Sequence, residues 1–84
     1  MFDFLKPKKN KELEGIIARI ESNMANNYKD NAQSAFKELE QKVSEMIDGG
    51  VLSDRQATEY ISKVSFYREK MQGFTHKDQK PYWT

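Results

Sequence analysis

Apolar side chains recur at intervals of three or four residues in three separate stretches of the chain. This spacing places them on one face of a helix, because a helix has about 3.6 residues per turn. The stretches span roughly residues 10–24, 28–48 and 54–71, and they predict three amphipathic helices. Their apolar positions are Leu13, Ile16, Ile17, Ile20 and Met24, then Ala32, Ala35, Phe36, Leu39, Val43, Met46 and Ile47, and finally Ala57, Tyr60, Ile61, Val64, Tyr67 and Met71.

Polar residues that favour helix ends separate the first two stretches. Asn10 can cap the first helix, and Asn26 and Asn27 tolerate the left-handed geometry that ends one. Two starts remain open for the second helix. Asp30 with Gln33 would form a capping box, and Asn27 with Asp30 would form a rival one three residues earlier.

A stretch reading Asp-Gly-Gly-Val-Leu-Ser-Asp-Arg-Gln ends the second helix and begins the third within a few residues. Gly50 can take the left-handed conformation that stops a helix without steric cost. Val51 then falls where an apolar contact back to Met46 is expected. Ser53 can cap the third helix, and Gln56 completes its capping box. The stretch predicts a tight helical hairpin.

These signals together predict an all-α fold, a short three-helix bundle with up-down-up order. The helical domain is expected to span residues 10–73, since Gly73 is a natural helix stop. Residues 1–9 are expected to form a flexible basic N-terminus. Residues 74–84 have no period and contain Pro81, so we expect a flexible C-terminal tail. No segment alternates for long enough to predict a strand.

The composition fits a small folded core. A chain of 84 residues forms one domain at most. Its mean hydropathy of -0.92 is low, but a net charge of only +1 argues against disorder of the whole chain. The absence of cysteine excludes disulfides and thiolate sites and fits a reducing compartment. No apolar run approaches the roughly 18 residues of a membrane span, and the first residues do not resemble a secretory signal. The expected location is the cytoplasm.

The charges are distributed unevenly along the chain. Residues 1–11 carry four lysines and one aspartate, whereas residues 12–62 carry ten acidic and five basic side chains. Residues 63–84 carry five basic and two acidic side chains. Basic ends therefore flank an acidic centre. Such ends are either simply solvated, or they contact a polyanion that the centre repels.

The sequence contains no pattern typical of a catalytic or metal site. His76 is the only histidine, and it lies in the unpatterned tail without the partners that a general base or a metal ligand needs. An EF-hand calcium loop aligned on Gly50 would place Ile47, Gly49 and Gln56 where oxygen ligands are required. We therefore predict no enzymatic activity, no cofactor and no metal.

Binding is the class of function that remains. We predict a small accessory or regulatory protein that acts through protein–protein contacts or self-association. The alternative is a nucleic-acid accessory protein that uses its basic ends, with Tyr82 and Trp83 stacking on a single strand. A helix-turn-helix reader is disfavoured, because Asp54 and Glu59 place negative charge near the start of the third helix.

Phe66 is a large apolar side chain outside the stripe of its helix. It lies about 200° around the helix from Val64, and a phenyl ring is costly to leave in water. The N-terminal phenylalanines could fold back over it, the tail with Trp83 could wrap around it, or a second chain could dock. We expect one of the terminal segments to cover Phe66. In the third case Phe66, Phe74 and Trp83 form a candidate contact patch.

Overall fold

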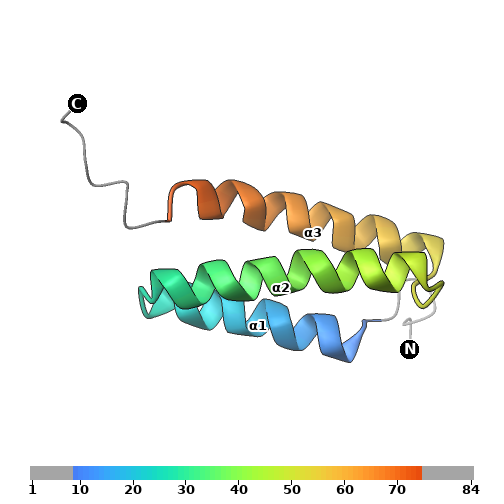
Figure 1. Cartoon of the computed structure of the whole chain (residues 1–84), viewed down its shortest axis with the longest axis horizontal. Helices are drawn as coiled ribbons and strands as arrows, with labels where there is room; N and C mark the ends of the chain where they lie inside the picture. The colour runs from blue at the N-terminus through green and yellow to red at the C-terminus, as the bar shows by residue number, and fades with distance from the viewer. Residues whose placement is uncertain (1–8, 75–84) are drawn as a thin grey trace, which may run out of the picture.

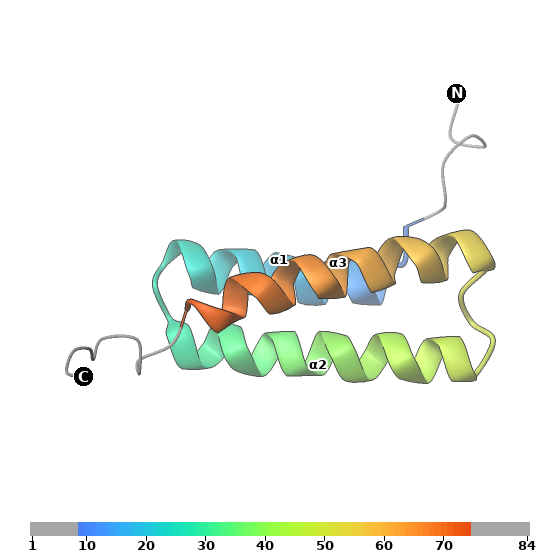
Figure 2. The ribbon, with the colours of Figure 1, turned by 90° about the horizontal axis from the view of Figure 1, so that it is seen from above.

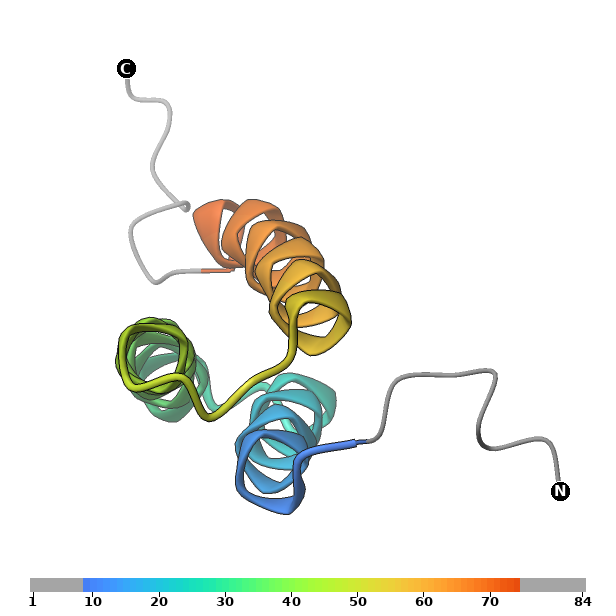
Figure 3. The same ribbon diagram turned by 90° about the vertical axis from the view of Figure 1, so that its right-hand side faces the viewer.

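Three helices form an up-down-up bundle in the computed structural model, which describes residues 9–74 (Figure 1). The helices are α1 (Lys11–Ala25), α2 (Lys29–Asp48) and α3 (Asp54–Gln72). α2 runs antiparallel to both of the others and packs against both (Figure 2). Viewed along their axes, the three helices lie at the corners of a triangle (Figure 3). The described residues contain no strand, and the predicted three-helix bundle is confirmed.

α1 begins and ends at the predicted asparagines. The side-chain oxygen of Asn10 accepts a hydrogen bond from the backbone N–H three residues later, at 3.0 Å. At the other end, Asn27 has a φ of 61°. Its N–H donates to the carbonyl of Met24 at 3.1 Å, and the N–H of Tyr28 donates to the carbonyl of Asn23 at 2.8 Å. This pair of bonds closes a helix that is followed by a left-handed residue.

The start of α2 differs from both predicted capping boxes. Tyr28 is the N-cap residue, and no side chain caps the helix. Asn27 lies one residue before the N-cap and Asp30 lies inside the helix, so neither predicted capping box forms, although the helix begins within one residue of the earlier predicted start. Asn27 instead adopts the left-handed conformation that ends α1. The next residue, Tyr28, is already the N-cap of α2, so no residue between the two helices is available as a side-chain cap.

Gln33 makes a tertiary contact in place of the predicted local one. Its Nε2 donates to the backbone carbonyls of Met71 and Phe74, at 2.9 Å each. Met71 lies in the last turn of α3, where carbonyls have no partner within the helix, and Phe74 lies two residues past the end of α3. Gln33 therefore ties the beginning of α2 to the end of α3.

The turn between α2 and α3 has the predicted left-handed glycine. Gly50 has a φ of 73°. Its N–H donates to the carbonyl of Ile47 at 3.1 Å, and the N–H of Val51 donates to the carbonyl of Met46 at 2.9 Å. These two bonds form a Schellman motif, which satisfies carbonyls that the end of α2 would otherwise leave unpaired.

The predicted capping box at the start of α3 is also confirmed. The Ser53 hydroxyl oxygen accepts from the N–H of Gln56 at 3.2 Å, and the Gln56 side-chain oxygen accepts from the N–H of Ser53 at 3.0 Å. Between this box and the Schellman motif, Leu52 is buried in the core, whereas Val51 is 61% exposed. Leu52 is thus the turn residue that packs in the core, and the contact of Val51 with Met46 stays a prediction.

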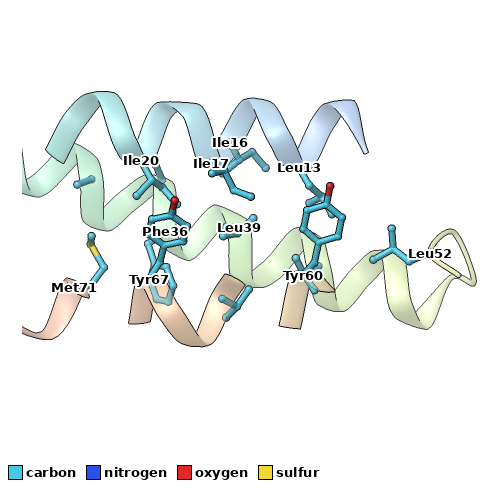
Figure 4. Close-up of a cluster of buried hydrophobic side chains, with 14 residues drawn as sticks. Leu13, Ile16, Ile17, Ile20, Phe36, Leu39, Leu52, Tyr60, Tyr67 and Met71 are labelled. Atoms are coloured by element: carbon cyan, nitrogen blue, oxygen red, sulfur yellow. The ribbon is translucent and has the colours of Figure 1, made fainter. Parts of the chain in front are cut away.

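The core lies between the three helices, and the side chains labelled in Figure 4 point toward one another from all of them. It consists of Leu13, Ile16, Ile17, Ile20, Ala32, Ala35, Phe36, Leu39, Val43, Leu52, Tyr60, Val64, Tyr67 and Met71.

Two residues predicted for the core lie outside it. Ile47 is 37% exposed and Ile61 is 54% exposed. Each directly follows a residue that packs on the core, Met46 in α2 and Tyr60 in α3. Consecutive helical residues point about 100° apart, so while Met46 and Tyr60 pack on the core, Ile47 and Ile61 lie at the edge of their apolar stripes. Within residues 9–74, no further helix covers Ile47 or Ile61.

We predict that alanine is tolerated less well at position 50 than at position 49. Gly49 has an ordinary φ of -84°, whereas the positive φ of Gly50 strains any residue with a Cβ. Gly50→Ala should lower the free energy of unfolding by about 1–2 kcal/mol more than Gly49→Ala does, and Gly50→Val should lower it further. Urea denaturation measures both. Equal losses at the two positions would contradict the left-handed conformation of Gly50.

We predict that Ser53→Ala lowers the free energy of unfolding by about 1 kcal/mol, because it removes the acceptor that caps α3. Ser62→Ala is the matched control. Ser62 is exposed within α3, where alanine is the better helix former, so this change should not destabilise the protein. The midpoints of urea denaturation give the comparison, and equal midpoints for Ser53→Ala and the wild type would exclude a stabilising role for the cap.

Candidate interaction groove between α2 and α3

Phe66, the first predicted contact residue, lies on α3 and is 54% exposed. Its ring packs edge-on against that of Tyr67, with 5.0 Å between the ring centroids. The Nζ of Lys70 lies 5.0 Å from the centroid of the Phe66 ring. Neighbours on its own helix thus shield part of the ring. The terminal segments that we expect to cover Phe66, and Trp83 with them, lie outside the described residues, so that expectation stays a prediction.

Phe74, the second predicted contact residue, packs against the core and is only partly exposed. Its carbonyl accepts the hydrogen bond from Gln33, and the Nζ of Lys29 lies 5.9 Å from its ring centroid. Phe74 is therefore held at the beginning of α2, whereas Phe66 lies beside Tyr67 and Lys70 of α3. The two phenylalanines have different surroundings and different degrees of exposure.

A groove of about 400 Å³ lies between α2 and α3. The buried side chains of Val43 and Val64 form its floor, and the exposed side chains of Ile47 and Ile61 stand on its two sides. All of its lining residues belong to these two helices, so the groove opens away from α1. Apolar residues from both helices meet here at the surface.

The five polar residues that line the groove are placed in order along it. At one end Arg68 of α3 donates to Glu40 of α2 at 2.6 Å, which forms an ion pair across the groove. Ser44 and Ser65 follow, one from each helix, and Asp48 lies at the end near the turn. The middle of the groove is therefore lined by small and apolar side chains, with charges at its ends.

Sequence reasoning missed this groove because it placed Ile47 and Ile61 in the core. A signal was present in the pairs Met46–Ile47 and Tyr60–Ile61. Two adjacent apolar residues widen the stripe of a helix beyond what one contact can cover. A stripe of that width predicts either a second neighbour or an exposed edge, and the pattern alone does not distinguish the two.

Two tyrosines connect α3 to α1 on the opposite side of the molecule. The buried Tyr60 donates its hydroxyl to Oε2 of Glu14 at 2.6 Å and accepts from the backbone N–H of Asn10 at 2.9 Å. Tyr67, also buried, donates its hydroxyl to Glu21. The rings point from α3 toward α1 (Figure 4), and each ends at a carboxylate of α1.

These contacts keep both phenols protonated. Burial, followed by the hydrogen bond to Glu14, raises the pKa of Tyr60 to about 12. Burial and the hydrogen bond to Glu21 raise the pKa of Tyr67 above its usual range. A phenol with a raised pKa is a poor base or nucleophile at neutral pH. The tyrosine–carboxylate pairs therefore act as structural links between α3 and α1.

Residues 9–74 contain no group of three or more histidine, cysteine, aspartate or glutamate side chains that could hold a metal ion. None of the helices in the same range has the length and the apolar character needed to cross a membrane. Comparison with protein-family models found no match, and comparisons with curated proteins and with solved structures found none either. The groove is thus the feature from which a function can be argued.

We predict that Tyr60→Phe weakens the dependence of stability on alkaline pH. Because the pKa of folded Tyr60, about 12, lies above the ordinary value of 10.0, its stabilisation is complete below pH 10 and is lost as the pH rises through 12. Tyr60→Phe should lower the free energy of unfolding at neutral pH by about 1 kcal/mol, through the lost hydrogen bond. It should also reduce the further loss at alkaline pH.

Urea denaturation at neutral pH and at several alkaline values measures both effects. Tyr28→Phe is the control, because Tyr28 is exposed and its hydroxyl lies outside the link to α1. It should leave the alkaline loss as it is in the wild type. The same alkaline loss in Tyr60→Phe and in the wild type would contradict a phenol held protonated by the fold.

Proposed function

We propose that this protein is a small interaction module that docks the apolar face of a protein helix in the groove between α2 and α3. One observation carries the proposal: the exposed side chains of Ile47 and Ile61 stand on either side of a floor made by Val43 and Val64. Each of the two helices thereby keeps one large apolar side chain in contact with water at the same groove.

The energetics of apolar surface support docking at this place. Removing apolar surface from water contributes roughly 25 cal/mol per Å², and Ile47 and Ile61 are large side chains that keep much of their surface exposed. A helix laid between α2 and α3 would cover both at once. It would extend the three-helix arrangement toward a four-helix bundle, in which each helix packs against two neighbours.

The distribution of charge around the groove also supports docking. Charged residues make up 32% of the chain, yet the middle of the groove is lined by serines and aliphatic side chains. The centres of protein interfaces are depleted of charged residues in the same way. The Glu40–Arg68 ion pair lies at one end, where an interface commonly has its polar rim.

The proposal concerns binding alone, and the absence of enzymatic activity and the cytoplasmic location stay predictions from the sequence. The alternative of nucleic-acid binding also stays a prediction, since four of the nine basic residues of these ends, together with Tyr82 and Trp83, lie outside the described residues. One detail bears on a helix-turn-helix reading of α3. The side chain of Gln56 is already hydrogen-bonded within the capping box, at a position that such a reader would use for bases.

Site-specific photo-crosslinking tests the groove. We predict that a photo-reactive amino acid at Ser65, inside the groove, gives covalent adducts with protein when the full chain is expressed in the cells that encode it. Adding Ile61→Asp should abolish these adducts, because a carboxylate on the apolar edge opposes burial. The same photo-reactive residue at Ala18, exposed on α1, is the matched control and should give none.

Two outcomes count against the proposal. Absence of adducts at Ser65 would mean that no protein occupies the groove. Equal yields at Ser65 and Ala18, unaffected by Ile61→Asp, would mean that the adducts reflect random collisions. Circular dichroism of each variant verifies that the helical content is unchanged.

A further inference from the structure

We propose that the groove is occupied by a second copy of this chain, related by a two-fold axis parallel to the helices. The inference rests on the proposed function, since it names the partner of the same groove. In this arrangement α3 of each copy lies on α2 of the other, and the four helices form one bundle. The residues along the groove favour this partner and this orientation.

The order of residues along the groove makes the surface complementary to itself. Glu40 pairs with Arg68, Ser44 and Ser65 follow, and Ile47 and Ile61 come next. A rotation about an axis parallel to the helices exchanges α2 and α3 but keeps each residue at its height. Each groove residue of α3 then faces an α2 residue of the second copy. This α2 residue is the one that lies across the groove from it within a single chain.

Three kinds of contact result from this placement. Ile61 meets Ile47 of the second copy, so the exposed apolar side chains cover each other. Ser65 meets Ser44 of the second copy, and these small side chains allow the helices to approach closely. Arg68 meets Glu40 of the second copy, and two ion pairs therefore combine into a ring of four alternating charges. A guanidinium group has five donors, which suffice for two carboxylates.

The other symmetric arrangement has its axis perpendicular to the helices, and its contacts are unfavourable. It sets α2 on α2 in opposite directions. Centred on the groove, it brings Glu40 to the height of Asp48 of the second copy, and both are negative. It also brings Arg68 near Ile61 of the second copy. Like charges that face each other across an interface cost free energy, so the parallel axis is the one that the groove favours.

The size of the surface is sufficient for a dimer of moderate affinity. α2 has 20 residues and is therefore about 30 Å long. A face two helices wide spans about 20 Å, since packed helices lie 8–10 Å apart. The product, about 600 Å² per copy for the whole α2–α3 face of which the groove is one part, reaches the lower bound for specific protein–protein interfaces. Association should accordingly depend on concentration.

Sedimentation equilibrium of the full chain, from micromolar to millimolar concentration, tests the inference. The wild type should form dimers. Arg68→Glu and Glu40→Arg should each weaken association at least tenfold, because each places like charges across the interface. An equimolar mixture of these two variants should recover the wild-type affinity, since position 68 of each chain then again faces the opposite charge at position 40 of the other.

A second ion pair of similar geometry supplies the control. Arg19 of α1 and Glu38 of α2 form an exposed ion pair at 2.9 Å on a different side of the molecule. Arg19→Glu and Glu38→Arg should therefore leave the dimer affinity unchanged. The double variant Glu40→Arg/Arg68→Glu keeps an ion pair within the chain and should associate like the wild type, which separates effects on folding from effects on association.

The results distinguish this inference from the proposed function. A wild type that stays monomeric up to millimolar concentration overturns the second copy as the partner. A mixture of Arg68→Glu and Glu40→Arg that fails to recover affinity overturns the parallel axis. In the crosslinking experiment, a Ser65 adduct of twice the chain mass supports the inference. An adduct only with another protein overturns it and leaves the proposed function intact, and the absence of any adduct overturns both.

Discussion

The arrangement of the whole protein depends on α2 having two neighbours. Its apolar stripe packs against α1 along one side and α3 along the other. A stripe that serves two neighbours has to be wide, and its outer edge extends past the contact with α3. Ile47 lies on that edge and stays accessible. The residue that widens the stripe thus also becomes part of the groove.

The position of α3 follows from contacts at its C-terminal end and along its side. Gln33 binds the carbonyls at its C-terminal end, while Tyr60 and Tyr67 span the gap to α1 and end at Glu14 and Glu21. A tyrosine suits this place because its ring fills apolar space and its hydroxyl reaches a polar partner at the edge. By holding α3 on this side, the tyrosines leave its opposite side, with Ile61, facing outward.

The proposed interaction therefore follows from how the bundle is built. Within the described residues, three helices bury the centre of each apolar stripe but leave the groove between α2 and α3 without a covering helix. A fourth helix in that groove would remove the remaining apolar edge from water. The ion pair at one end of the groove gives it a direction, and the small side chains in its middle allow close contact. Direction and close contact are what a specific interface needs beyond apolar area.

The sequence by itself determined the number of helices and most of their ends. Asn10, Gly50 and the Ser53–Gln56 box act within a few residues of their own position, so the local sequence suffices to place them. Only the tertiary structure decided the partner of Gln33, the exposure of Ile47 and Ile61, and the links from the tyrosines to α1. These features join residues far apart in the chain, and a periodic pattern records which face of a helix is apolar but not which element covers it.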